Sequence, residues 1–247
     1  MDSKAIIDGI VVELTAGATP ERAAAEKRYL KSDLDFIGAT MPTIRRVSRS
    51  VQRDHPELGR PEVLRLVKQL WKRPIHELRA AAVELLELYG SLLEPGDIGL
   101  IEQMLRQSRT WALVDNLSAS VAGPLVERYP ELGDVLDAWA TDDDFWIRRS
   151  AMLALLKPLR AGGGDFVRFT RYADGMLEEK EFFIRRAIGW VLRDTARKRP
   201  ALVADWVGPR TDRMSGVTIR EAIKRLPPDQ AADFLAAYRE HRPAASS

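Results

Sequence analysis

The chain has 247 residues, of which 45% are apolar, and a formal net charge of +2, so it can form a packed core. It has no cysteine, which excludes disulfides, thiolate metal sites and a cysteine nucleophile. It also lacks any run of about 18 apolar residues of the kind that spans a membrane.

Helical spacing of apolar residues recurs along the whole chain, and no stretch is convincing as a β-strand. Thr19 and Pro20 are typical of a helix start, because threonine caps the first turn and proline fits its first position. The predicted helices are 3–16, 20–30, one beginning at Pro42, 61–71, 75–89, 95–107, one carrying Trp111, 132–140, one from Phe145, 165–177, 181–198, 201–207, 217–225 and 228–240.

Three local features refine this helix pattern. Ser108 or Thr110 is expected to cap the helix that carries Trp111, and Gly123-Pro124 is expected to interrupt that helix. No linker is long enough to separate two domains, so residues 1–241 are predicted to form a single domain. Residues 242–247 are predicted to be a disordered tail.

The beginning of the chain, MDSKAIIDGIVVEL, is acidic and amphipathic and does not resemble a signal peptide, so we expect a cytosolic protein. The three histidines, His55, His76 and His241, are far apart in sequence and show no metal-ligand spacing. We expect them to lie on the surface, and we expect neither a metal ion nor a cofactor.

A helical motif repeats along the chain. Residues 182–193 read FFIRRAIGWVLR, residues 145–156 read FWIRRSAMLALL, and residues 217–226 read VTIREAIKRL. The matching apolar positions, which lie 35, 34, 37 and 35 residues apart, are Leu78, Leu113, Ile147, Ile184 and Ile219. Such a period indicates an all-α fold, a HEAT-like or armadillo-like α-solenoid of stacked antiparallel helix pairs.

Equivalent helices of a solenoid line one concave face, and the register gives that face a basic character. Residues 145–225 carry 18 Lys and Arg against 9 Asp and Glu, whereas the rest of the chain carries 20 against 27. A basic concave face suits a polyanion such as nucleic acid. The alternative is that these arginines form ion pairs within the protein. Equivalent turns carry Arg148, Arg185 and Arg220, and the next position carries Asp115, Arg149, Arg186 and Glu221.

Trp111 and Asp115 are four residues apart and therefore share one helix face. A carboxylate beside an aromatic ring can hold a cationic group, and the cation–π part contributes roughly 0.5–2 kcal/mol. Trp190 could supply a second ring from another repeat. Taken alone, Asp115 is also compatible with a salt bridge between helices.

At these positions the sequence resembles the AlkD-type DNA alkylation repair glycosylases, over about residues 20–226. The segments that carry the resemblance are RYLKSDLDFIG at 28–38, WALVD at 111–115, FWIRR at 145–149, EFFIRRAIGWVLR at 181–193 and REAIKRL at 220–226. It implies a HEAT-like solenoid that removes cationic purines, chiefly 7-methylguanine and 3-methyladenine, from duplex DNA. It also implies that the protein grips the DNA backbone without flipping the base.

The resemblance implies roles for individual residues. Asp115 matches the catalytic carboxylate, Trp111 and Trp190 match the aromatic walls of the cleft, Tyr29 matches a tyrosine at its edge, and Arg149 matches a phosphate-binding residue. Related sequences can carry a second tryptophan where this chain has Thr110, which places the shape of the cleft wall in question. Weaker candidates for binding the DNA backbone are Arg148, Arg185, Arg186 and Lys224.

Two alternatives remain. The chain could be a non-catalytic solenoid that binds branched or damaged DNA, or a protein-interaction solenoid without a nucleic-acid role. DNA binding that weakens steeply with salt would favour the glycosylase or the non-catalytic DNA-binding solenoid, and its absence would favour the protein-interaction solenoid. The expected partner is double-stranded DNA with alkylated bases, bound by a monomer away from membranes, and no lyase activity is expected.

Overall fold

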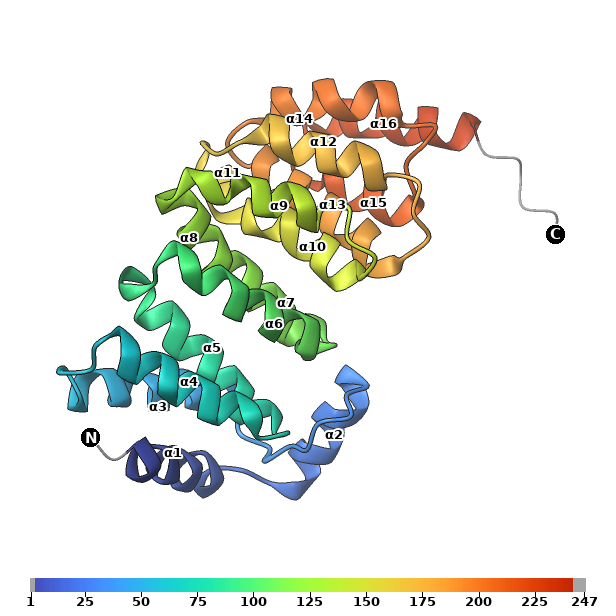
Figure 1. Cartoon of the computed structure of the whole chain (residues 1–247). Helices are drawn as coiled ribbons and strands as arrows, with labels where there is room; N and C mark the ends of the chain where they lie inside the picture. The colour runs from blue at the N-terminus through green and yellow to red at the C-terminus, as the bar shows by residue number, and fades with distance from the viewer. Residues whose placement is uncertain (1–2, 242–247) are drawn as a thin grey trace. The chain divides into compact units, whose positions relative to one another are not determined.

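The computed structural model describes residues 3–241, and all of its named elements are helical (Figure 1). In this range we find no β-strand, only an isolated bridge between Asp35 and Ile75. The all-α class predicted from the sequence is therefore confirmed. The predicted tail, 242–247, lies outside the described residues.

The chain divides into two compact units, Met1–Tyr129 and Pro130–Ser247. The first contains α1 (Ser3–Ala16), α2 (Pro20–Leu30), α3 (Met41–Asp54), α4 (Arg60–Lys72), α5 (His76–Leu88), α6 (Ile98–Ser108), α7 (Trp111–Asn116) and α8 (Gly123–Arg128). The second contains α9 (Gly133–Trp139), α10 (Phe145–Ala154), α11 (Leu156–Ala161), α12 (Phe166–Met176), α13 (Phe182–Ala196), α14 (Pro200–Val207), α15 (Gly216–Ala222) and α16 (Pro228–Glu240). A single domain over 1–241 stays a prediction.

Helix boundaries follow the capping chemistry read from the sequence. The hydroxyl of Thr19 accepts a hydrogen bond from the Arg22 amide at 3.2 Å, with proline in the first turn of α2, as predicted. The Thr110 prediction is only half right. Thr110 occupies the N-cap position of α7, but its side chain makes no capping bond, and its buried hydroxyl has no hydrogen-bond partner in the described part of the chain.

The apolar positions of the predicted repeat form the core. All five, Leu78, Leu113, Ile147, Ile184 and Ile219, are no more than 1% exposed. In the second unit the helices that carry the last three of them, α10, α13 and α15, pack in series. Within each unit, the spacing of about 35 residues thus marks successive repeats that bury the same helix face against one another.

Gly189 permits the closest of these helix contacts. A Cβ atom added at Gly189 would lie 2.7 Å from the Cβ of Glu221 and 2.9 Å from the carbonyl oxygen of Thr218. The backbone of α15 therefore fills the space that a side chain on α13 would need. Glycine allows this approach because it has no Cβ, and the approaching element is the next repeat.

The predicted interruption at Gly123-Pro124 takes another form. Between α7 and α8, residues Leu117–Ala122 form a π-helical segment, η3, in which the Gly123 amide donates to the Ser118 carbonyl, five residues back. Pro124 cannot donate to a carbonyl in the preceding turn, and its ring would crowd that turn in a regular α-helix. The wider π-helical turn precedes the proline, and the chain stays helical from 111 to 128.

His76 corrects the expectation that all three histidines lie on the surface. Its side chain is 6% exposed, and its ring stacks on Phe36 at a centroid distance of 4.8 Å and an interplanar angle of 14°. Burial lowers the pKa of His76. His55 is partly exposed and His241 is exposed, as predicted.

Within residues 3–241, none of the helices combines the length and the apolar composition that spanning a membrane requires.

Candidate functional site

In the first unit, α7 presents the predicted carboxylate and one of the predicted rings. Trp111 and Asp115 are both partly exposed, so neither is sealed in the core. The ring of Tyr29, on α2, meets the ring of Trp111 edge-on, with centroids 5.9 Å apart at an interplanar angle of 89°. Because Tyr29 is 73% exposed, this pair forms an accessible aromatic surface beside the carboxylate helix.

Helix α2, which carries Tyr29, has no buried residue of its own. Polar contacts therefore hold it to the rest of the first unit. The carboxylate of Glu77, which is fully buried at the start of α5, accepts bonds from the amides of Ile37, Gly38 and Ala39 at 2.9, 2.5 and 3.2 Å. Those amides belong to the loop that joins α2 to α3. The position of Tyr29 therefore depends on a buried carboxylate that binds a loop.

Behind α7, a second buried carboxylate contacts the residue next to Asp115. Glu84 is 6% exposed, and its Oε1 accepts bonds from Asn116 Nδ2 at 3.2 Å and Arg45 Nε at 3.4 Å. Burial raises the pKa of Glu84, although the charge of Arg45 opposes the rise. These contacts attach the end of α7 to α3 and α5.

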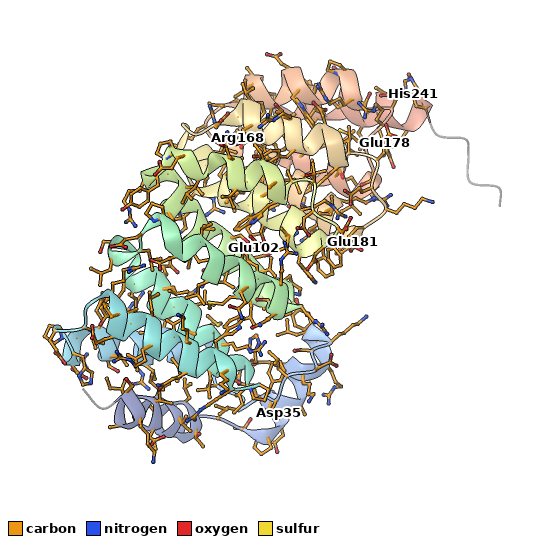
Figure 2. All side chains as sticks on the ribbon, in the orientation of Figure 1. Asp35, Glu102, Arg168, Glu178, Glu181 and His241 are labelled. Carbon is orange, nitrogen blue, oxygen red and sulfur yellow. The ribbon has the colours of Figure 1, made fainter. Side chains whose placement is uncertain are left out.

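In the second unit, two of the three weaker arginine candidates, Arg148 and Arg185, are bound to the protein itself. Arg148 forms two hydrogen bonds with the Glu179 carboxylate, at 3.0 and 2.8 Å, and also donates to the carbonyls of Asp142 and Asp143. Arg185 Nε donates to the carbonyl of Glu179 at 2.6 Å. Glu179 lies in the connection between α12 and α13, where Figure 2 marks the neighbouring Glu178 and Glu181.

Arg149 lies beside an aromatic cluster at the beginnings of α10 and α13. Its Nη1 donates to the carbonyl of Phe183 at 2.5 Å, and its guanidinium carbon is 5.9 Å from the centre of the Phe183 ring. The rings of Phe145, Trp146 and Phe183 contact one another with centroids 4.6 to 6.3 Å apart. Arg149 is 2% exposed, and its role in binding phosphate stays a prediction.

Trp190 is oriented by a carboxylate that sequence reasoning did not single out. Its indole Nε1 donates to Asp194 Oδ2 at 3.2 Å, one helical turn along α13. Asp194 is 1% exposed and also binds Arg160 at 2.7 Å and Arg193 at 3.1 Å. Burial alone would raise the pKa of Asp194, but the hydrogen bond and charge of Arg160, followed by those of Arg193, hold it below its usual value.

Arg193 links this group to a second buried carboxylate, Glu221 of α15, through Nη1 and Oε1. The opposite oxygen of Glu221, Oε2, accepts a bond from Lys224 Nζ at 2.6 Å and lies 3.8 Å from Arg186 Nη1. The predicted backbone-binding residues Arg186 and Lys224 therefore meet at one carboxylate. Sequence register places Glu221 in the same repeat position as Arg186 but gives it no role.

The alternative that the arginines form internal ion pairs is thus confirmed for Arg148 and Arg186. The partners missed from the sequence are acidic residues of a neighbouring repeat, 28 to 39 positions away in the chain. Such pairs include Arg45–Glu84, Arg60–Asp97, Arg148–Glu179, Arg160–Asp194, Arg186–Glu221, Arg193–Glu221 and Arg210–Asp174. An acidic residue about one period away from each arginine is the signal that could have found them.

No group of three or more His, Cys, Asp or Glu within residues 3–241 is arranged to hold a metal ion. A surface groove of about 670 Å³ lies in the first unit between α1 and α3. Its lining includes Ile6, Ile10, Val47 and Val51 but none of the predicted site residues.

The predicted site residues are divided between the two units. Trp111, Asp115 and Tyr29 belong to the first unit, whereas Arg149 and Trp190 belong to the second. Their meeting over one nucleotide stays a prediction.

Comparison with known proteins identifies relatives. Residues 10–226 match the family model of the DNA alkylation repair enzyme. A predicted DNA alkylation repair enzyme from Enterococcus faecalis is similar in structure, with a TM-score of 0.76 and 20% identity over 85% of this chain and 97% of that one. AlkD2 from Streptococcus mutans is similar with a TM-score of 0.60 and 14% identity over 83% of this chain and 99% of that one. At these identities the two structures show the fold, an all-helical α-solenoid. No curated protein matches the sequence.

Proposed function

The chain belongs to the family of DNA alkylation repair enzymes, and from that premise we propose that it is a monofunctional DNA glycosylase of base excision repair. Its substrates are purines that alkylation at N3 or N7 has made cationic, such as 3-methyladenine and 7-methylguanine, in duplex DNA. It hydrolyses the N-glycosidic bond: the C1′–N bond breaks, the base leaves with the bonding electrons as a neutral molecule, and the oxygen of water binds C1′ as a hydroxyl group while one proton of that water passes to the solvent.

The observation that supports this proposal most directly is the pairing of a carboxylate with an accessible aromatic surface. Asp115 and Trp111 are one turn apart on α7, both partly exposed, and Tyr29 extends the aromatic surface. Alkylation weakens the bond to be broken, because the departing base leaves as a neutral molecule. The transition state then carries positive charge on the deoxyribose, as in other glycoside hydrolyses.

We assign Asp115 two roles in this reaction. Its negative charge stabilises the positive charge that develops on the sugar, and the same carboxylate orients the attacking water. Trp111 and Trp190 contact the sugar-phosphate backbone through their ring faces. There, cation–π attraction to the positive charge on the sugar adds to van der Waals contact. Arg149 binds a backbone phosphate, and Arg148, Arg185, Arg186 and Lys224 add positive charge along the same strand. Because the backbone is gripped in this way, the base need not be flipped into a pocket.

The test is base release from duplex DNA that carries 7-methylguanine. We expect Asp115→Asn to retain DNA binding while the rate of release falls about a hundredfold or more, the size of effect found when one group that stabilises transition-state charge is removed. Glu102→Gln is a matched control, because Glu102 lies on α6 of the same unit and pairs with Arg106 at 2.7 Å. It should release base at the wild-type rate.

The second candidate is a non-catalytic protein that binds damaged or branched DNA. It uses the same DNA-binding residues as the first candidate but gives Asp115 no chemical role. This candidate predicts that wild-type protein binds DNA but releases no base from any alkylated substrate, and that Asp115→Asn leaves the binding unchanged. Base release by the wild type that is lost in Asp115→Asn would rule this candidate out.

A further inference from the structure

Glu221 is the point at which three cations of the second unit converge. Its carboxylate contacts Arg193, Lys224 and Arg186, so the immediate surroundings carry an excess of two positive charges. The residue is only 3% exposed. Burial alone would raise the pKa of Glu221, but the hydrogen bond from Lys224 and the charges of Arg193, Lys224 and Arg186 hold it below its usual value, so the carboxylate is ionised at neutral pH.

The three cations differ in how far they reach solvent. The side chains of Arg186 and Lys224 are 53% and 54% exposed, whereas that of Arg193 is 25% exposed. Both exposed cations contact the same oxygen, Oε2, with Lys224 Nζ at 2.6 Å and Arg186 Nη1 at 3.8 Å. Two long and otherwise flexible side chains, from α13 and from the turn after α15, are therefore held close enough to bind one phosphate together.

The depth of Glu221 in the protein depends on Gly189. The Cβ of Glu221 occupies the space next to the Gly189 backbone, where any side chain would collide with it. On its other side Glu221 is fixed by Arg193, which also binds Asp194, the partner of the Trp190 indole. The carboxylate is thus anchored at its base and at one oxygen, and its second oxygen is directed to the two exposed cations.

We infer that Glu221 is a positioning residue that holds Arg186 and Lys224 together as a single binding site for one DNA backbone phosphate. The inference rests on the proposed function only in taking DNA as the ligand, and it requires no base release. It also runs against simple charge counting. A carboxylate near a phosphate should weaken binding, so its presence is useful only if the arrangement of the two cations compensates for the added negative charge.

The experiment measures binding of unmodified duplex DNA at several salt concentrations. We expect Glu221→Gln to raise the Kd about threefold to tenfold at low salt. It should also reduce the slope of log K against log salt by about one, because one phosphate contact contributes roughly 0.9 to that slope. Charge counting predicts the opposite, tighter binding. A Kd for Glu221→Gln that is unchanged or lower, with an unchanged slope, overturns the inference.

Glu178→Gln is the matched control. Glu178 is in the same unit, pairs with Arg213 at 2.7 Å and has a side chain that is 67% exposed, so its removal changes the charge by the same amount at an ordinary surface pair. It should bind DNA as tightly as wild type or slightly more tightly. If Glu221→Gln does not fold, Glu221→Asp keeps the charge but withdraws it by one methylene, and weaker binding with a smaller slope is again expected.

The outcomes separate this inference from the proposed function. Wild-type protein that binds DNA and releases no methylated base refutes the glycosylase proposal and leaves the effect of Glu221→Gln on binding to decide the inference. Wild-type protein that releases base but whose DNA binding does not respond to Glu221→Gln refutes the inference alone. Binding by the wild type that is absent or independent of salt overturns the inference as well.

Discussion

Replacement of Glu77 should loosen the loop and helix that carry Tyr29 without unfolding the protein. Glu77 is fully buried and accepts hydrogen bonds from three consecutive amides of the loop between α2 and α3. The helix that precedes this loop, α2, contributes no buried residue of its own. Its place in the first unit therefore depends on this carboxylate more than on apolar packing.

The expected size follows from those bonds. A hydrogen bond to a charged group contributes about 1.5–3 kcal/mol, and an amide left unsatisfied in the interior costs a similar amount. Glu77→Gln keeps one acceptor oxygen and loses the charge, so we expect the free energy of local opening to fall by about 2 kcal/mol. Because about 1.4 kcal/mol is a factor of ten, the open state should become about 30 times more populated.

Amide hydrogen exchange of the native protein measures this opening directly. In Glu77→Gln the amides of α2 and of residues 37–39 should exchange about 30-fold faster, whereas those of α5 should change less. Glu21→Gln is the control, because Glu21 is exposed in the first turn of α2 and its replacement should speed exchange in α2 only a few-fold, through the weak attraction between its charge and the helix dipole. Equal exchange rates in α2 for Glu77→Gln and the wild type would refute the view that this carboxylate anchors the helix.

Two further predictions concern stability. Burial lowers the pKa of His76 below its usual 6.5, so the unfolded chain takes up a proton more readily than the folded protein does. The free energy of unfolding should therefore fall as the pH drops below about 6.5. Urea unfolding at about pH 7.5 and about pH 5 should show a smaller fall for His76→Phe than for the wild type. Ile184→Ala should cost about 2–5 kcal/mol, because Ile184 is fully buried in the repeat core. Val167→Ala, at a residue that is 79% exposed, should cost less than about 0.5 kcal/mol in the same unfolding measurements.

The elements that could be predicted from the sequence are those set by local spacing. Helix positions follow from the 3.6-residue period and from caps such as Thr19, and the five equivalent apolar positions follow from the longer period. Both kinds of signal are present in the order of residues alone. For the same reason the sequence predicts that Trp111 and Asp115 share one face of a helix, which is the arrangement on α7.

The partners of the charged residues could not be predicted in this way. Arg148 and Arg186 belong to the same type of motif, yet one binds Glu179 in the connection between α12 and α13 and the other lies near Glu221 in the next repeat. Which carboxylate an arginine meets depends on how neighbouring helices are rotated, and that rotation is set by close contacts such as the one at Gly189. The burial of His76 escapes prediction for a similar reason, because it is completed by Phe36 from a distant loop.

The π-helical turn after Asp115 has a consequence for how the protein can vary. A π-helical turn holds about one residue more than an α-helical turn, and each residue of an α-helix advances the chain by about 100°. Removing one residue from Leu117–Ala122 would restore a regular helix and leave Trp111 and Asp115 facing nearly the same direction relative to α8, whereas the same deletion in a regular α-helix would rotate them by about 100°. This six-residue segment is therefore the place in the helix where the chain can lose one residue without redirecting the proposed catalytic carboxylate.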